Sequence, residues 1–548
     1  MIQAITINET DNLAVALTDL KAGTDVTVND IKVKLVHNIP AKHKFALFDF
    51  DKGAKLTMYG LVVGTANQPI GKGEAITTSN VIHMTSGYDL NKQTKYEWQA
   101  PDVSKFEDRT FMGYHRSDGQ VGTDNIWLVF PLVFCENRNV NVLKSAFEKA
   151  LGYEDNNPYE SMVSSLVNHY QQNSLDTALD TVTLESVQPK TNQGVFENVK
   201  IRFITHQSGC GGTRQDSESL CRLFAGYVNN PNVAGATVLS LGCQNAEVKT
   251  LTQAIKEINP NQDKPVIILD QQGTGTENDL ISKAIKQTFK GMTEANKIAR
   301  KPAPLSKLTI GLECGGSDGF SGISANPTVG YCADLVSALG GKVMLSEFPE
   351  LCGVEQELIN RMKSKELAKK FTALMEAYSN AAEAVGSGFD MNPSPGNIKD
   401  GLITDAMKSA GAAKKGGTSP INDILDYTEY AKEPGLSLLC TPGNDVESTT
   451  GLVGSGANVV LFTTGLGTPT GNPVAPILKV SSNSKLAEKM PDLIDINTGP
   501  VIEGTKTIQQ MGEEMLEQVI KIASGEVTSK AVQMKQHDFI PWKRGVSL

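Results

Sequence analysis

The sequence predicts a multidomain α/β protein in which a small all-β domain precedes a two-part α/β body with largely parallel sheets. Three observations support this prediction. A chain of 548 residues is long enough for roughly three or four domains. Residues 1–90 contain short, often alternating apolar segments separated by turn residues, which is typical of β-structure. From Phe111 onwards, apolar strand patterns alternate with helical patterns, which indicates a mostly parallel sheet.

The composition limits the class of protein. With 40% hydrophobic and 20% charged residues it is typical of a soluble globular protein, and its net charge of −10 argues against nucleic-acid binding. No run approaches the ~20 apolar residues of a membrane span, and the start of the chain lacks the pattern of a secretion signal. The 8 cysteines are sparse and are expected to be reduced. We therefore expect a cytoplasmic enzyme for a small molecule, without nucleic-acid or membrane partners, that forms a homo-oligomer such as a dimer.

The N-terminal 90 residues are predicted to form an independent all-β module. Strands are expected at 14–16, 26–28, 31–35, 45–48 and 56–64. Residues 91–108 are polar and without periodicity, and are predicted to be a linker.

Two α/β domains are expected next, at 109–260 and 261–548. The apolar run 126–134 suits a strand buried on both faces. Further strands are predicted at 199–205, 236–241, 265–270, 308–312, 342–345, 436–439 and 458–462. Helices are predicted at 142–151, 217–228, 246–258, 280–301, 329–341, 355–385 and 508–522.

The glycine-rich stretch Gly311–Pro327 follows one of these strands. It places a thiol, two carboxylates and several hydroxyls on a loop where an α/β sheet usually binds its ligands. Glycine lets such a loop adopt positive φ and approach a ligand closely. We interpret the stretch as a substrate loop containing Ser317, Asp318 and Asn326; the alternative is a tight turn with polar caps.

Three cysteines occupy matched positions, because Cys210, Cys243 and Cys314 each follow an apolar strand and have glycine beside them. Strand ends on one edge of a sheet converge, so the three thiols are predicted to share a pocket. His206 lies four residues before Cys210. It could bind the same metal, or it could act as a general base. Thiolates bind iron and zinc. An iron–sulfur cluster on the three cysteines is an alternative, and so is a set of separately buried small residues.

Other candidates are polar residues in predicted loops. Glu347 and Glu350 flank Phe348-Pro349 after a strand and could act as paired carboxylates, or form a solvated pair. The segments 392–397 and 463–472 are rich in hydroxyl and amide groups, which suit sugars or carboxylates. His43 is a candidate proton carrier, and Arg116 could neutralise a carboxylate. Surface or fully hydrogen-bonded roles are expected for His83, His169 and His537. The glycines match neither a Walker A nor a Rossmann fingerprint.

Several motifs together resemble the altronate dehydratase/galactarate dehydratase family, nearly from end to end. The motifs that carry the resemblance are Arg116-Ser-Asp-Gly-Gln-Val-Gly-Thr, Leu241-Gly-Cys-Gln-Asn, Leu312-Glu-Cys-Gly-Gly-Ser-Asp-Gly-Phe-Ser-Gly-Ile-Ser-Ala-Asn-Pro, Asn392-Pro-Ser-Pro-Gly-Asn and Phe462-Thr-Thr-Gly-Leu-Gly-Thr-Pro. The resemblance implies an N-terminal SAF-type β-clip domain, a second domain and a large C-terminal domain. It also implies a metal-dependent hydro-lyase, with ferrous iron or sometimes manganese, that converts a hexonate or hexarate such as altronate into a 2-keto-3-deoxy acid.

The chain departs from the family pattern at three places. Residues 75–80 contain no histidine where a His-x-His-x-His-Asn run is usual, and Leu466 replaces an arginine. Asn397-Ile-Lys-Asp400 replaces the usual Asn-Lys. The alternatives are therefore a non-catalytic sugar-acid-binding relative, or a lyase of this family that acts on another hydroxy acid.

The predicted metal ligands are Cys210, Cys243, Cys314 and His206. The predicted catalytic residues are His43, Lys44, His206, Glu347 and Glu350. The predicted substrate-binding residues are Arg116, Asp118, Ser317, Asp318, Asn326, Asn392, Asn397 and Thr464.

Overall fold

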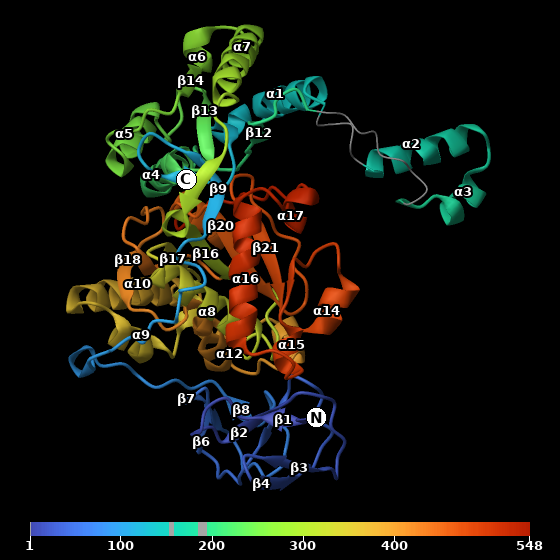
Figure 1. The fold of residues 1–548 in the computed structure, drawn as a ribbon, viewed down its shortest axis with the longest axis vertical. Coiled ribbons are helices and arrows are strands. Elements are labelled where there is room, and N and C mark those ends of the chain that lie inside the picture. Colours follow the sequence, from blue (N-terminus) through green and yellow to red (C-terminus); the bar gives the residue numbers. More distant parts are fainter. Residues whose placement is uncertain (1, 153–157, 185–193, 548) are drawn as a thin grey trace.

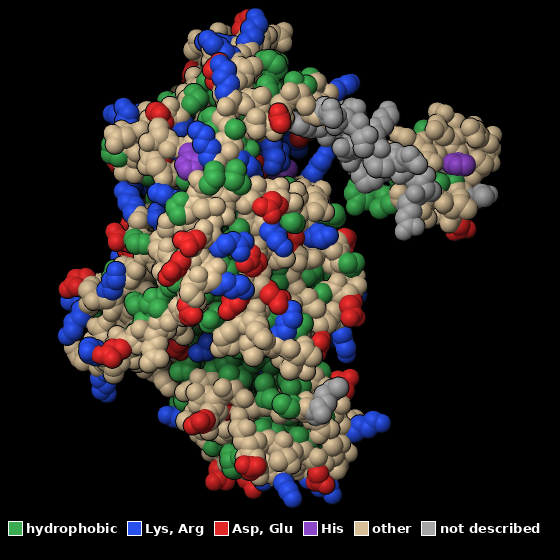
Figure 2. Space-filling view, in the orientation of Figure 1, with side chains coloured by type: hydrophobic (Ala, Val, Ile, Leu, Met, Phe, Trp, Pro, Cys, Tyr) green, Lys and Arg blue, Asp and Glu red, His purple; other side chains and the backbone are tan. Residues whose placement is uncertain are grey.

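The computed structural model describes residues 2–152, 158–184 and 194–547. The molecule is elongated, with the N-terminal domain at one end, an α/β domain at the other and the largest domain between them (Figure 1). We call these the N-terminal, second and third domains. On the face seen in Figure 2, acidic and basic side chains are interspersed. No helix of the described residues has the length and apolar character needed to span a bilayer.

The N-terminal domain is all β, as predicted, and its strands pair antiparallel in small sheets. Alternation of buried and exposed residues, clearest in β3, places one face of each hairpin in the core. The strands are β1 (Ala4–Ile5), β2 (Leu13–Ala16), β3 (Asp25–Val28), β4 (Ile31–Lys34), β5 (Lys44–Ala46), β6 (Lys55–Met58), β7 (Leu61–Ala66) and β8 (Val81–Ile82).

The predicted linker, 91–108, is irregular and lies against the third domain. The Gln93 side chain donates hydrogen bonds to the Ile359 and Met362 carbonyls, at 3.0 and 2.8 Å. The Tyr96 hydroxyl donates to the Thr418 carbonyl at 2.6 Å. The linker therefore holds the N-terminal domain against the third domain, and not against the second domain, which follows it directly in the chain.

The second domain contains a parallel sheet in the order β12-β11-β13-β14, flanked by helices. A smaller antiparallel sheet, β10-β9-β15, joins it to the third domain. Its elements are β9 (Thr110–His115), β10 (Val121–Gly122), β11 (Ile126–Pro131), α1 (Asn137–Ala150), α2 (Pro158–Gln171), α3 (Leu175–Thr181), β12 (Lys200–Phe203), α4 (Arg214–Asn229), β13 (Val233–Ser240), α5 (Val248–Ile258), β14 (Val266–Asp270), α6 (Gln271–Thr274), α7 (Glu277–Ala295) and β15 (Lys301–Pro304). Helices α2 and α3 project from the body as an arm (Figure 1).

The third domain is built on a seven-stranded, fully parallel sheet in the order β18-β19-β17-β16-β20-β21-β22. Its central strands are buried throughout, which explains their continuous apolar runs. The elements are β16 (Thr309–Cys314), α8 (Ala325–Ala338), β17 (Lys342–Leu345), η5 (Phe348–Leu351), α9 (Glu355–Arg361), α10 (Lys365–Glu383), α11 (Pro395–Lys399), α12 (Asp405–Ala412), η7 (Ala413–Gly416), β18 (Ile421–Leu425), β19 (Gly435–Leu439), α13 (Asp445–Gly454), β20 (Val459–Thr464), β21 (Ile477–Ser481), α14 (Ser484–Lys489), β22 (Ile496–Asn497), α15 (Gly499–Ile502), α16 (Ile508–Ala523) and α17 (Lys530–Gln533).

The core is layered around this large sheet. Ile310 and Leu312 on β16 belong to the core on one face of the sheet, together with residues of α8 and α16. Met344 and Phe462 belong to a second core that includes residues of α13 and α4. Helices α4 and α13 approach so closely that a Cβ on Gly226 would lie 1.8 Å from the carbonyl oxygen of Gly454. The second and third domains therefore share a continuous apolar core.

The predicted boundary after residue 260 is wrong. Strand β14 pairs with β13 through Leu269 and Leu239, and α7 packs on the same sheet, so both belong to the second domain. The third domain starts with β16, after the connecting strand β15. The alternation of strands and helices is uninterrupted from one domain to the next, which is why the sequence pattern alone misplaced the division.

Candidate active site

The candidate site lies where the strand order of the seven-stranded sheet reverses. The chain enters the sheet at β16, continues to β17, β18 and β19 on one side, and returns at β20 on the other side of β16. Cys314 ends β16 and Thr464 ends β20, so both lie at the reversal. Open α/β sheets bind ligands at the carboxyl ends of their strands at such a point.

Five charged or thiol side chains meet there and are all buried: Cys314, Glu347, Glu350, Lys408 and Lys415. We call them the ionic cluster. Nζ of Lys415 lies 2.7 Å from Oε2 of Glu347, and Nζ of Lys408 lies 2.7 Å from Oε1 of Glu350. The Cys314 sulfur lies 3.2 Å from Glu347 and 3.0 Å from Glu350. Two lysines and two glutamates thus balance each other around one thiol.

Burial and charge act in opposite directions on these groups. Burial raises the pKa of Glu350, but Lys408 and Lys415 outweigh it and lower that pKa to about 2. Burial lowers the pKa of Lys415, but Cys314 and the nearby glutamates outweigh it, so its pKa is well above the ordinary value. Burial, Glu347 and Glu350 raise the pKa of Cys314 well above its ordinary value. The Lys415 ammonium group therefore keeps its charge beside an ionised Glu350.

The backbone at Glu347 is held in an unusual conformation. Its φ of 68° is in the left-handed region, which costs a residue other than glycine about 1–3 kcal/mol. Its N–H donates to the Thr441 hydroxyl at 2.8 Å, and its side chain accepts from the Cys314 N–H at 3.1 Å. These contacts retain the strained turn that directs the carboxylate into the ionic cluster.

Two further acids border the cluster. Burial and the charge of Glu347 raise the pKa of Glu313 well above its ordinary value, and its carboxyl accepts a hydrogen bond from Ser346 at 2.7 Å. Burial, with Glu347 and Glu350, raises the pKa of Asp445 to about 7. A Cβ on Gly315 would lie 2.1 Å from Oδ2 of Asp445, so only glycine lets the strand end approach this acid. Asp445 can therefore exchange a proton near neutral pH.

Polar loops surround this strand end. The Asn397 side chain donates to the Ser317 carbonyl at 2.7 Å, which joins the two predicted binding loops. Asn326 donates to the Gly411 carbonyl at 3.0 Å and accepts from Thr463 at 2.8 Å. Asn392 accepts from Lys408 at 3.1 Å. The Thr464 hydroxyl accepts from the Gly467 N–H at 2.9 Å, which shapes the loop after β20.

The N-terminal domain contributes a loop to the same region. Nζ of Lys42 lies 3.0 Å from Oδ2 of Asp318 and 2.9 Å from Oδ1 of Asp400. Nζ of Lys44 is buried and donates to the Gly401 carbonyl at 2.6 Å; burial lowers its pKa to about 7. His43 Nε2 lies 3.0 Å from the Lys399 carbonyl oxygen. The predicted residues His43 and Lys44 thus contact the third domain beside Asp318, while their catalytic role stays a prediction.

The predicted meeting of three cysteines is wrong. Cys210 and Cys243 are exposed, and they follow β12 and β13 of the second domain. Cys314 is buried in the third domain. Among the described residues, the groups of potential metal ligands contain Cys314 with Glu347 and Glu350, but neither Cys210 nor Cys243. The geometry therefore supports neither a shared metal nor an iron–sulfur cluster on the three thiols.

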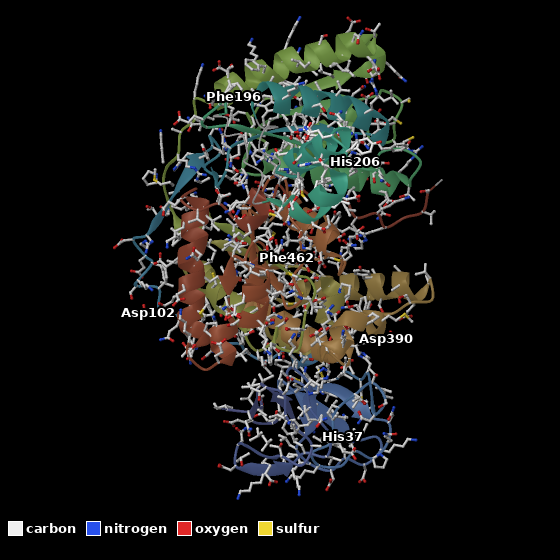
Figure 3. All side chains as sticks on the ribbon, turned by 90° about the vertical axis from the view of Figure 1, so that its right-hand side faces the viewer. His37, Asp102, Phe196, His206, Asp390 and Phe462 are labelled. Atoms are coloured by element: carbon white, nitrogen blue, oxygen red, sulfur yellow. The ribbon has the colours of Figure 1, made fainter. Side chains whose placement is uncertain are left out.

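The predicted role of His206 is also wrong. Its Nε2 lies 2.8 Å from the Pro131 carbonyl oxygen, and its Nδ1 accepts from the Ser208 N–H at 3.1 Å. Both ring nitrogens are therefore occupied by the backbone. Burial lowers the pKa of His206 to about 4, which keeps it neutral. Figure 3 shows His206 in the domain above the one that contains Phe462.

Arg116 and Asp118 are structural rather than substrate-binding. The Arg116 guanidinium donates to the Pro231 carbonyl at 2.7 Å and to the Asn125 side chain at 2.9 Å. Asp118 accepts from the Gln120 and Asn259 side chains, both at 2.8 Å. These contacts hold the β9–β10 hairpin within the second domain, away from the end of β16.

A divalent cation does not fit the ionic cluster as arranged. Ligand atoms of Cys314, Glu347 and Glu350 do lie within 4.8 Å of one another. However, the ammonium groups of Lys408 and Lys415 already contact both carboxylates at 2.7 Å. A cation at this point would add two positive charges to a balanced, buried group. The ferrous iron or manganese that the resemblance implies therefore has no place in the steps proposed below.

The sequence interpretation missed Lys408, Lys415 and Asp445. Lysine is usually a surface residue, so these two carried no chemical signal of their own. A structural signal was present, because Lys408 and Lys415 flank the run Ser409–Lys414, which is rich in alanine and glycine. Such a run is typical of close packing, and a lysine within it is a candidate for burial.

Comparisons with known proteins cover the whole chain. Residues 2–84 match the family model for the altronate/galactarate dehydratase SAF domain. Residues 113–296 match the D-galactarate dehydratase/altronate hydrolase second domain, and residues 305–547 match the D-galactarate/altronate dehydratase C-terminal domain. These ranges agree with the three domains of the structure.

Curated relatives point the same way. The chain is 33% identical to the altronate dehydratase of Escherichia coli (strain K12) over 550 residues, which is 100% of both chains. It is 29% identical to the galactarate dehydratase (L-threo-forming) of the same organism, over 97% of this chain and 95% of the relative. It is 25% identical to the (2R)-sulfolactate sulfo-lyase subunit beta of Chromohalobacter salexigens, over 77% of this chain and 94% of the relative.

Proposed function

Because the chain belongs to the D-galactarate/altronate dehydratase family, we propose that it removes water from a six-carbon sugar acid, an aldonate or aldarate, at the ionic cluster. The observation that carries this proposal is the buried arrangement of Lys408 and Lys415 around Glu347 and Glu350 at the strand reversal. Stabilising a carbanion next to a carboxylate requires positive charge in a place shielded from water. The ionic cluster supplies that charge.

The reaction is a β-elimination with balanced steps. A base removes the proton at C2, and the electron pair forms an enediolate with the substrate carboxylate. The C3–O bond then breaks, an acid protonates the departing hydroxyl, and water leaves. The resulting enol takes up a proton at C3, loses the proton of its C2 hydroxyl and becomes a 2-keto-3-deoxy acid.

We assign these tasks to residues at the end of β16. The ammonium groups of Lys408 and Lys415 stabilise the developing enediolate. Glu347 removes the C2 proton, because its carboxylate is placed beyond the strand end by a strained backbone and lies against Lys415. Asp445 protonates the departing hydroxyl, because its pKa of about 7 leaves it partly protonated at neutral pH.

The direct test is a product screen. The purified protein is incubated with a panel of aldonates and aldarates, and 2-keto-3-deoxy acids are detected by mass spectrometry. Turnover of at least one acid supports the proposal. A protein that binds a sugar acid, seen as a shift in melting temperature, but yields no product would instead be the non-catalytic relative.

A second candidate reaction has support from one relative. The (2R)-sulfolactate sulfo-lyase subunit beta is named for elimination of a sulfur group, and it matches 77% of this chain. The same carbanion chemistry would expel a different group at C3. Including 3-sulfolactate in the screen and measuring released sulfite distinguishes this reaction from dehydration.

Asp445→Asn is expected to change the pH dependence of the reaction. The raised pKa means that Asp445 is protonated below about pH 7 and loses its proton above it, so kcat should fall as pH rises through 7. Asparagine cannot donate the proton, and we expect kcat to fall about 10²–10⁴-fold. The measurement is kcat across about pH 5–9, a span that brackets this pKa. A falling limb near pH 7 that persists in the variant would contradict the assignment.

Leu466→Arg is expected to widen the substrate range. Leu466 is 37% exposed. A Cβ on Gly316 would lie 3.2 Å from the Leu466 Cβ, so this side chain borders the loop after β16. A guanidinium there would attract a second carboxylate, and KM for aldarates should fall about 10-fold relative to aldonates. Leu466→Gln is the uncharged control. An equal change in KM for both substrate classes would show that a side chain at this position does not contact the second carboxylate of an aldarate.

A further inference from the structure

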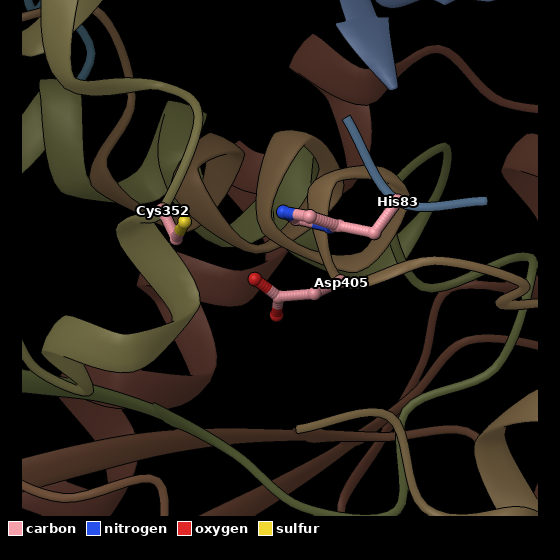
Figure 4. Close-up of side chains that lie close together, drawn as sticks. All are labelled: His83, Cys352 and Asp405. Carbon is pink, nitrogen blue, oxygen red and sulfur yellow. The ribbon is translucent and has the colours of Figure 1, made fainter. Parts of the chain in front are cut away.

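Three side chains from distant segments point toward one another at the junction of the N-terminal and third domains (Figure 4). His83 follows β8, Cys352 follows η5, and Asp405 is the first residue of α12. One ligand atom from each lies within 4.8 Å of the other two. None of these residues belongs to the ionic cluster.

Two polar atoms of this group lack partners. Within the described residues, Nδ1 of His83 and Oδ2 of Asp405 are buried and have no hydrogen-bond partner. Asp405 is 0% exposed. An unsatisfied buried polar group destabilises a fold, and two of them facing one space indicate a missing partner. The sequence-based expectation that His83 is a surface or fully hydrogen-bonded histidine is therefore wrong.

The surroundings favour a cation as that partner. Besides burial, Asp405, Glu355 and Asp390 all raise the pKa of the Cys352 thiol, so carboxylates face the group from several sides. Burial and Glu350 raise the pKa of Asp405 well above its ordinary value, and Lys408 opposes this. Lys408 is already engaged, because its Nζ contacts Glu350 at 2.7 Å. A bound cation would compensate the local negative charge and favour the ionised forms of both groups.

Contacts of the protein itself hold the three segments together without a bound cation. Gly353 has a φ of 91°, and a Cβ there would lie 2.6 Å from Cγ2 of Thr85, so the chain after His83 passes directly over it. The Thr404 hydroxyl donates to the Val63 carbonyl at 2.5 Å, which ties the start of α12 to β7. The ligand atoms are thus prearranged by contacts that do not depend on a metal.

We propose that His83, Cys352 and Asp405 bind a divalent cation of intermediate softness, Zn²⁺ or Fe²⁺, that fastens the N-terminal domain to the third domain. One nitrogen, one sulfur and one oxygen donor suit these ions, and water completes the coordination. Donor atoms around a tetrahedral zinc are about 3.3–3.8 Å apart, and those of the three side chains lie within 4.8 Å of one another, so a shift of at most about 1.5 Å brings them to this spacing. Asn392 donates from its amide to Asp405 at 3.3 Å and accepts from Lys408 at 3.1 Å, which links this site to the ionic cluster.

The test uses metal content and a spectroscopic probe on the full-length protein. The protein is stripped with a chelator and reloaded separately with Zn²⁺, Fe²⁺ and Co²⁺ under anaerobic conditions. Bound metal is counted by mass spectrometry, and the Co²⁺ form is examined for a thiolate-to-cobalt charge-transfer band. The variants are His83→Gln and Cys352→Ser. Two controls, His37→Gln and Cys135→Ser, alter an exposed histidine and an exposed cysteine. A third control, Cys314→Ser, alters the thiol of the ionic cluster.

We expect one metal per chain, a band that Cys352→Ser abolishes, and an at least 10-fold weaker affinity in His83→Gln. Zn²⁺ should also raise the melting temperature of the parent protein but not of the two variants, because the ion binds only the folded state. A band that survives Cys352→Ser but disappears in Cys314→Ser would place the cation in the ionic cluster and overturn the proposal, and so would a chain that retains no metal. Turnover by the stripped protein is measured separately, so loss of this site and loss of the proposed dehydration are distinguishable.

Discussion

Replacing Lys415 with methionine is expected to abolish most of the dehydration activity and to destabilise the third domain. The Lys415 side chain is 1% exposed and lies 2.7 Å from Glu347 and 3.9 Å from Glu350. Its loss leaves buried carboxylates without their counter-charge, which typically costs about 3–5 kcal/mol. It also removes positive charge from the developing enediolate, and kcat should fall at least about 10²-fold. Product formation and the melting temperature are the two measurements.

Lys414→Met is the matched control for this change. Lys414 is the preceding residue, its side chain is 33% exposed, and its nitrogen lies 3.7 Å from Glu357. Such a partly exposed pair contributes about 0–1 kcal/mol, so this variant should behave like the parent. If Lys415→Met retained full activity, or if both variants lost it equally, the ionic cluster would not be the catalytic centre.

Gly319→Ala is expected to separate the N-terminal loop from the site. A Cβ on Gly319 would lie 2.3 Å from the carbonyl oxygen of Lys42 and 2.9 Å from its Cβ. Because the atoms it meets belong to the Lys42 backbone and Cβ and not to the flexible end of a side chain, the loop carrying His43 and Lys44 must move away from Asp318. A misplacement of about 1 Å in a positioned group can cost about 10²-fold in rate, so a similar loss in kcat/KM is expected.

Gly396→Ala serves as the control because it makes the same change in α11, which adjoins the loop after β16 through the Asn397–Ser317 hydrogen bond. A Cβ there meets nothing closer than 3.7 Å, and the residue is helical, so alanine is readily accommodated. The kinetics of this variant should match those of the parent protein. Unchanged kinetics in Gly319→Ala, with a confirmed displacement of the loop, would show that the N-terminal domain takes no part in catalysis.

The rule that strand ends converge holds where the strands belong to one sheet. The loop after β16 and the carboxylates after β17 do meet, because these strands are neighbours in the seven-stranded sheet. The same rule failed for Cys210 and Cys243. Their strands belong to a different parallel sheet, and no local pattern states which strands pair over long separations.

Residues far from a strand end were harder to predict. Lys408 and Lys415 reach the ionic cluster from α12 and η7, about 100 residues after Cys314, and their role depends on tertiary packing alone. His83, Cys352 and Asp405 come from three segments that share no motif. The N-terminal all-β domain, by contrast, was predictable, because alternating strands and turn residues are local signals.

Catalysis at the ionic cluster is tested by a crystal structure of the Asp445→Asn variant with a bound aldonate that the parent protein dehydrates. We expect C2 and C3 of the ligand to lie within about 4 Å of Glu347, Lys415 and residue 445, the spacing of a near-attack arrangement. A cavity of about 530 Å³ lies between the second and third domains, away from the ionic cluster, and is lined by residues that include Arg222, Tyr427 and Arg544. An aldonate ordered in that cavity, with the ionic cluster unchanged and without ligand, would show that dehydration does not take place at the ionic cluster.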